Sequence, residues 1–166
     1  MGKQIENKIS KAGLVTIDIN KLVPKGSFLN IDLSDWLDGG VIKEVFFRKK
    51  LDLFDIGPFE GAYVYINCSR NAIIPPWAYL LIQAKLRNFA KEVFFCEKQT
   101  MMIILFEREL NMISKTEYKD KRVFLKGCYN DEIPLFYFSA CFNLIKNEVK
   151  SLFFGEPCSP ILLIKN

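Results

Sequence analysis

Three cysteines stand at positions where their thiols could act together. Cys68 and Cys128 each end a short run rich in β-branched and aromatic residues, and Cys158 follows a third such run. Residues of these types favour strands, so each cysteine is expected at or just after the end of a strand. In an open parallel sheet the carboxyl ends of the strands share one edge, and helix N-termini point toward it. The sequence therefore predicts that these three thiols converge.

Converging thiols have three ordinary uses, and the sequence leaves all of them open. As thiolates they bind zinc or iron, with water or a carboxylate in a fourth position. A thiol at a helix N-terminus is more readily ionised and can instead be redox-active or nucleophilic. Cysteine is also among the most buried residues, where it only fills the core. The candidate carboxylate ligands are Asp32, Asp35, Asp131 and Glu156.

Polar and aromatic residues beside these cysteines could complete a pocket. The candidates are Ser69, Asn71, Trp77, Asn130, Asp131 and Glu156. Free N–H groups at a helix start can hold an anion, although Ser, Asn and Asp at such positions usually cap the helix. Trp77 could wall the pocket, although aromatic residues at that spacing commonly fill the core. Cys96 and Cys141 fall inside a predicted strand and a predicted helix and are expected to be packing residues.

The composition excludes several kinds of catalytic and binding site and indicates the cellular compartment. The 166 residues contain no histidine, which removes Ser-His and Cys-His nucleophile pairs and histidine metal ligands. The 23 Lys and Arg and the 19 Asp and Glu are scattered along the chain, which argues against tight nucleic-acid binding. An odd number of cysteines, five, indicates a reducing compartment. With a polar start and no long apolar run, the chain is predicted to be soluble and cytoplasmic, away from the membrane.

The elements that must position these residues are predicted to occur twice. Residues 62–97 and 122–156 each show the pattern of strand, turn, helix and strand. Asn71 recurs 59 positions later as Asn130, and the cysteine-ending runs Tyr63–Cys68 and Val123–Cys128 are matched with each other. A strand, a helix and a second strand in that order form a right-handed parallel crossover.

The remaining segments predict one α/β domain over residues 1–166. The expected additions are a short helix at 3–11, strands at 14–19 and 27–33, helices at 41–54 and 98–115, and a tail strand at 161–164. The two N-terminal strands are expected to pair antiparallel. The rest forms a mostly parallel central sheet with helices on both faces. The wide apolar stripe of the 98–115 helix indicates burial on a second side, which a homodimer could supply.

Several short motifs resemble those of a known family. The resemblance rests on Asp35-Trp36-Leu37, Ile66-Asn67-Cys68-Ser69, Ala72-Ile73, Pro76-Trp77-Ala78-Tyr79, Lys126-Gly127-Cys128 and Gly155-Glu156-Pro157-Cys158-Ser159. These motifs are similar to the uncharacterised bacterial domain-of-unknown-function family 2480, over nearly the whole chain. That family has no established activity, so the resemblance implies no catalytic roles. This chain departs from the family pattern at Pro160, where the family is expected to have threonine.

The resemblance also bears on the choice of function. Members of this family tend to be encoded near iron–sulfur cluster assembly genes, which implies thiol or metal chemistry and iron–sulfur assembly proteins as partners. The first hypothesis is therefore a protein that binds zinc or iron, or handles an iron–sulfur precursor, through Cys68, Cys128 and Cys158. The second is a non-catalytic homodimeric or partner-binding module whose cysteines lie in the core. The third is a thiol enzyme that works without histidine.

Overall fold

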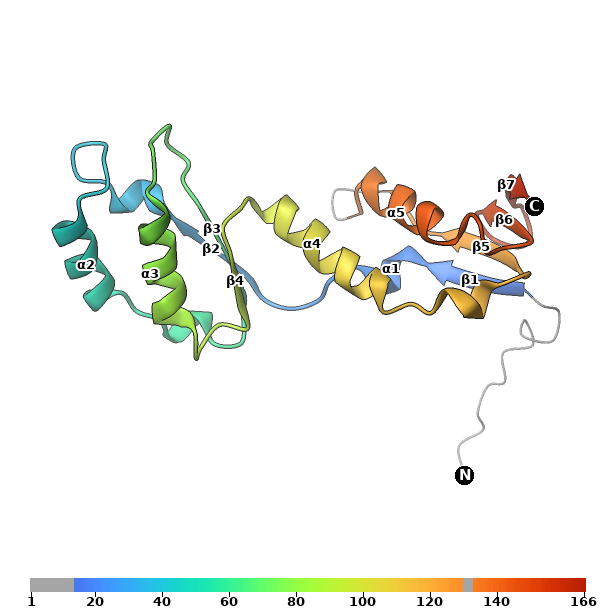
Figure 1. Ribbon diagram of the computed structural model, residues 1–166, viewed down its shortest axis with the longest axis horizontal. Coiled ribbons are helices and arrows are strands. Elements are labelled where there is room, and N and C mark those ends of the chain that lie inside the picture. Colours follow the sequence, from blue (N-terminus) through green and yellow to red (C-terminus); the bar gives the residue numbers. More distant parts are fainter. Residues whose placement is uncertain (1–13, 130–132) are drawn as a thin grey trace, which may run out of the picture. The chain divides into compact units, whose positions relative to one another are not determined.

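The computed structural model describes residues 14–129 and 133–166, and the helix expected at 3–11 lies outside them (Figure 1). The chain divides into two compact units. Unit 1 comprises Met1–Pro24 and Ile103–Asn166, and unit 2 comprises Lys25–Met102. Each unit contains its own sheet, so the α/β class is confirmed, but two largely parallel sheets replace the predicted central one. One domain over residues 1–166 stays a prediction.

Unit 2 is built on a parallel sheet with the strand order β2-β3-β4. Its elements are β2 (Phe28–Asp32), the 3-10 helix η2 (Leu33–Trp36), α2 (Glu44–Leu53), the 3-10 helix η3 (Gly57–Phe59), β3 (Tyr63–Asn67), α3 (Pro76–Leu86) and β4 (Glu92–Phe94). Successive strand residues point to opposite faces, so Val64 and Ile66 share one face. They join a buried cluster that includes Phe47 of α2 and Ile82 of α3. Both helices therefore pack against the same face of this sheet.

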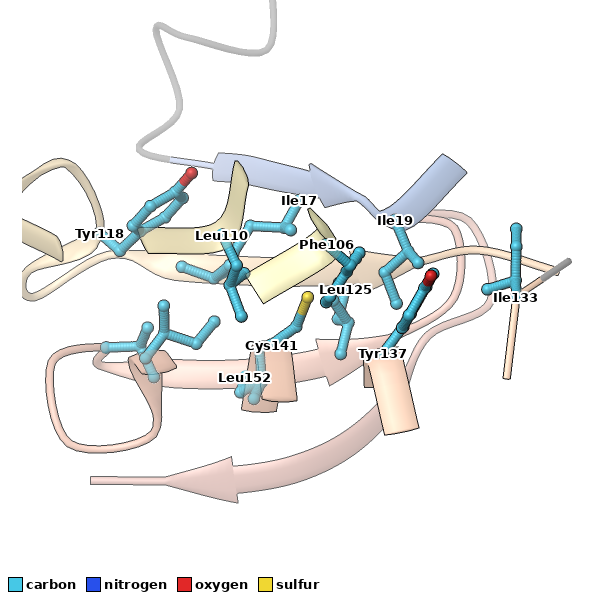
Figure 2. Packing of buried hydrophobic residues seen from close by; sticks show 13 residues of the cluster. Ile17, Ile19, Phe106, Leu110, Tyr118, Leu125, Ile133, Tyr137, Cys141 and Leu152 are labelled. Carbon is cyan, nitrogen blue, oxygen red and sulfur yellow. The ribbon is translucent and has the colours of Figure 1, made fainter. Parts of the chain in front are cut away.

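Unit 1 has the strand order β1-β5-β6-β7, in which only β7 is antiparallel to its neighbour. Its elements are β1 (Leu14–Asp18), α1 (Ile19–Leu22), most of α4 (Lys98–Asn111), the 3-10 helix η4 (Lys115–Tyr118), β5 (Arg122–Lys126), α5 (Leu135–Ile145), β6 (Ser151–Phe154) and β7 (Ile161–Lys165). Figure 2 shows Leu125 of β5 packed with Phe106 of α4 and Tyr137 of α5. The rings of Phe106 and Tyr137 stack, with 3.7 Å between their centroids. In both units the helices of the buried cluster share one sheet face, which differs from the predicted helices on both faces of one central sheet.

The antiparallel pairing predicted for the two N-terminal strands is wrong. β1 pairs in parallel with β5 in unit 1, whereas β2 pairs in parallel with β3 in unit 2. An alternating strand pattern identifies a buried face but carries no information about direction or partner, which only the tertiary fold supplies.

One other prediction is confirmed, because the tail forms the edge strand β7. Phe106 and Leu110 of α4 lie in the core of unit 1. Burial of a second side of this helix stays a prediction. No helix within the described ranges is long and apolar enough to cross a bilayer.

Helix α3 offers a matched test of the core of unit 2. Ile82 is fully buried, whereas Leu80 on the same helix is 55% exposed. We expect Ile82→Ala to lower the free energy of unfolding by about 2–5 kcal/mol, because it removes buried methyl groups and leaves a cavity. Leu80→Ala should change it by about 0.5 kcal/mol or less. Urea unfolding followed by circular dichroism measures both, and equal effects would contradict this packing.

Candidate functional site

A pocket of about 320 Å³ lies at the carboxyl ends of β3 and β4 in unit 2. Its lining comes from the turn after β3, from α3 and from the turn after β4. The polar and thiol side chains in this lining are those of Asn67, Cys68, Arg70, Asn71, Tyr79, Cys96 and Glu97. Ligands of open parallel sheets bind at this edge, and small-molecule sites start at about 300 Å³. The pocket therefore has the location and the size of a small-ligand site.

Asp32, the last residue of β2, fixes the turn that carries Cys68. Its Oδ1 accepts a hydrogen bond from the backbone N–H of Ser34 at 2.8 Å and another from that of Ser69 at 3.0 Å. Asp32 is thus the N-cap of η2. Partial burial would raise the pKa of Asp32, but hydrogen bonds from Ser69 and Ser34 outweigh it and lower the pKa from 3.8 to about 2.

Asn67 links the ends of β3 and β4. Its Nδ2 donates a hydrogen bond to Glu97 Oε2 at 2.8 Å. Its Oδ1 is buried and accepts no hydrogen bond from the residues that the structure describes. A buried amide oxygen favours a donor, because leaving it unpaired costs on the order of 1–3 kcal/mol. Asn67 is therefore held from one side and has an unused acceptor on the other.

Two thiols line the pocket in different surroundings. Burial raises the pKa of Cys96, the backbone N–H of Met101 offsets part of that rise, and the Glu97 carboxylate adds to it. Cys96 is therefore a neutral thiol at pH 7. Cys68 is half-buried and close enough to Tyr79 to affect its titration.

Tyr79 is the hydroxyl donor of the site. Burial raises the pKa of Tyr79 above 10, and the nearby Cys68 adds to the rise by disfavouring a second negative charge. The ring is held against Phe95, with 5.1 Å between the centroids. Tyr79 therefore keeps its proton at neutral pH and is a possible donor to a bound ligand or to the Cys68 sulfur.

The structure places the predicted cysteine site in two different units. Cys68 and Asn71 line the pocket of unit 2, and Ser69 helps to hold its turn. Cys128 and Cys158 lie in unit 1, where both are exposed. Among residues 14–129 and 133–166, no three Cys, Asp or Glu side chains are grouped so that they could hold a metal ion. The metal site at the three cysteines therefore stays a prediction.

The other predicted pocket residues are found in several places. Trp77 packs beside the core of unit 2, edge-on to Phe47 with 5.4 Å between ring centroids. Glu156 lies in unit 1, where its Oε1 accepts a hydrogen bond from Lys126 Nζ at 3.3 Å. Asn130 and Asp131 lie outside the described residues.

The match between Tyr63–Cys68 and Val123–Cys128 is displaced by one residue. Cys68 directly follows β3, whereas Gly127 directly follows β5 and Cys128 comes after it. A Cβ at position 127 would lie 3.0 Å from the Cβ of Ile19 and 3.4 Å from the ring of Phe138. A cysteine at that position would therefore need its neighbours to shift, and Cys128 is not the counterpart of Cys68.

Sequence reasoning missed Cys96 and Glu97 as parts of the site. Cys96 was expected inside a strand, but β4 ends at Phe94 and leaves Cys96 in the turn beyond the carboxyl end. The charged Glu97 directly after an apolar run was the signal that the strand had ended. The expectation for Cys141 is confirmed, because it is fully buried in unit 1 and burial raises its pKa to about 12 (Figure 2).

Asp32 provides a pH-dependent test of how the turn is held. Because its folded pKa of about 2 is below 3.8, its contribution to stability is present above about pH 4 and is lost as the pH falls toward 2. We expect Asp32→Ala to lower the free energy of unfolding by about 1–2 kcal/mol at pH 7, because it removes both the charge and the hydrogen-bond acceptor. This figure is reduced because the carboxylate is partly exposed to solvent. Asp32→Asn keeps an acceptor and should cost less. Urea unfolding between pH 7 and 2 measures this, and a pH-independent cost for Asp32→Asn would contradict the lowered pKa.

Comparison with known proteins gives a match at the family level. The family model described as Protein of unknown function (DUF2480) matches residues 3–166, which include both units. No curated protein and no solved structure matches the chain.

Proposed function

The chain belongs to the DUF2480 family of proteins of unknown function, and on that premise we propose that it binds a small polar molecule in the pocket beside Cys68. The observation that carries the proposal is the position of the pocket at the carboxyl ends of two adjacent parallel strands. Loops gather at this edge in open α/β sheets, which is why ligands bind there.

The lining is suited to orienting a polar ligand. Arg70 and Tyr79 supply donors, Glu97 supplies an acceptor, and Asn71 supplies both. Convergent polar groups are what fixes a ligand's orientation in small-molecule sites, and a lining that is mainly polar favours a polar ligand. Cys68 adds a half-buried sulfur, which gives the site a group for contact or for covalent chemistry.

An internal duplication is part of the same proposal. β5 begins at Arg122, 59 positions after β3 begins at Tyr63, and α5 follows α3 at the same separation. The buried helix positions recur as well, at Ala78, Ile82 and Leu86 in α3 and at Tyr137, Cys141 and Ile145 in α5. These agreements support a repeated strand, helix and strand over residues 62–97 and 122–156.

Zinc or iron at Cys68, Cys128 and Cys158 remains a separate prediction, with iron–sulfur assembly proteins or a homodimer partner as possible companions. That hypothesis expects about one metal ion per chain in protein purified without chelator. The Cys68→Ser, Cys128→Ser double variant should then lose the metal, because zinc and iron sites of this type need their thiolate ligands. Elemental analysis of both proteins makes the comparison, and equally negligible metal would remove the hypothesis.

Ligand-observed NMR tests the pocket directly. The probes are small amines, carboxylates, phosphates and amino acids that fit into about 320 Å³. At least one class should bind the wild-type protein, and Asn71→Trp, which fills the pocket, should weaken that binding about tenfold or more. Asn143→Trp is the matched control, because it adds the same side chain to a surface groove of unit 1. Binding by no probe, or equal loss in both variants, would refute the proposal.

A further inference from the structure

We propose that the ligand of the unit 2 pocket carries a primary ammonium group, bound at the position that a lysine of the chain itself occupies in unit 1. The inference rests on the proposed function above and names the chemical class of the ligand. It comes from a row of three polar residues that recurs at the carboxyl edge of each sheet.

The first two members of each row are paired in the strand ladders. In unit 2, Asp32 ends β2 and its Cα partner Asn67 ends β3. In unit 1, Asp18 ends β1 and its Cα partner Lys126 ends β5. An aspartate is thus followed across the sheet by the last residue of the middle strand in both units.

The third member of each row is a glutamate from the turn after the next parallel strand. Glu97 comes three residues after Phe94, and Glu156 comes three residues after Phe153. These two phenylalanines pair with the corresponding residues of the middle strands, Tyr65 and Phe124. The two rows therefore hold the same positions, and only the middle residue differs in chemistry.

In unit 1 the row is filled by an ammonium group. Lys126 Nζ lies 3.3 Å from Glu156 Oε1 and 3.8 Å from Asp18 Oδ2. The Asp18 side chain is only 18% exposed, so its attraction to the ammonium is partly shielded from solvent. An ammonium between two carboxylates makes charge-assisted interactions with each of them. Unit 1 thus shows which group this arrangement accepts.

In unit 2 the middle residue is the shorter, neutral Asn67. Asp32, which pairs with Asn67 in the strand ladder and lies next to the pocket lining, is charged at neutral pH. Glu97, which lines the pocket, is held by Asn67 Nδ2 at 2.8 Å. The Oδ1 of Asn67 is buried and unpaired within the described chain. Carboxylates and an amide oxygen are acceptors, so the row favours a positively charged donor.

Arg70 in the pocket lining bears on the remainder of the ligand. A guanidinium repels an ammonium but pairs well with a carboxylate. A plain alkylamine would use only the row, whereas an amino acid would place its ammonium at the row and its carboxylate toward Arg70. Both kinds of ligand carry the ammonium group. A probe with an ammonium group alone and a probe with an ammonium and a carboxylate group therefore distinguish a plain amine from an amino acid.

Amide NMR titration with n-propylamine, alanine and propionate tests the inference. In the wild-type protein the two amine-bearing probes should shift amides around Asn67, Cys68 and Glu97, and propionate should not. Asn67→Lys supplies the missing ammonium from within and should weaken amine binding about tenfold or more. Lys126→Asn opens the other row and should add amine-dependent shifts near Asp18 and Glu156. Asn143→Lys, which adds the same ammonium group to a surface groove of unit 1, should retain amine binding and is the matched control.

The outcomes separate this inference from the proposed function. Stronger shifts with alanine than with propylamine support the amino-acid source, and equal shifts support the plain amine. Equal amine binding by the wild type and a folded Asn67→Lys overturns the inference. A carboxylate or phosphate that binds where no amine does overturns the inference but leaves the pocket proposal intact. Failure of every probe, including the wider set tested against Asn71→Trp, overturns both.

Discussion

Parallel pairing of β2, β3 and β4 brings the ends of three strands to one edge of unit 2. The positions of Asn67 and Glu97 in the candidate site depend on that pairing. The register places Asp32 beside Asn67, and the next crossover brings Glu97 within 2.8 Å of the same asparagine. An antiparallel neighbour would send the end of its strand to the opposite edge, and these three residues would not share one edge. The pocket is thus a consequence of strand direction.

Strand alternation supplies the support beneath that edge. On one face of the unit 2 sheet, Val64 and Ile66 pack against two helices. On the other face the aromatic rings follow one another across the strands, with 5.8 Å between the centroids of Phe28 and Tyr63 and 6.4 Å between those of Tyr63 and Phe94. Cross-strand aromatic pairs stabilise a sheet in addition to the helix-covered core. The residues at the carboxyl ends of these strands are therefore held in place by helix packing on one face of the sheet and by contacts between aromatic rings on the other.

The five cysteines show that the reactivity of a thiol depends on its burial and its neighbours as well as on its residue type. Cys141 lies in an apolar core, where burial raises its pKa to about 12 and leaves it inert. Cys96 is partly buried beside a carboxylate and stays protonated, whereas Cys68 faces a pocket with a tyrosine nearby. Cys128 and Cys158 are exposed. Spacing in the sequence could nominate Cys68 but could not separate it from the two exposed thiols.

The sequence by itself determined the local elements of this protein. The helix at Pro76 starts where a missing N–H costs least, the strand 122–126 follows from its apolar and β-branched residues, and the apolar tail forms a strand as expected. These features depend on neighbours along the chain, so they can be predicted from it. The tertiary structure decided which strands pair, that two sheets form, and that Asn67, Cys96 and Glu97 surround one pocket. Those outcomes depend on contacts between distant residues, and a strand's pattern of alternation specifies neither its partner nor its direction.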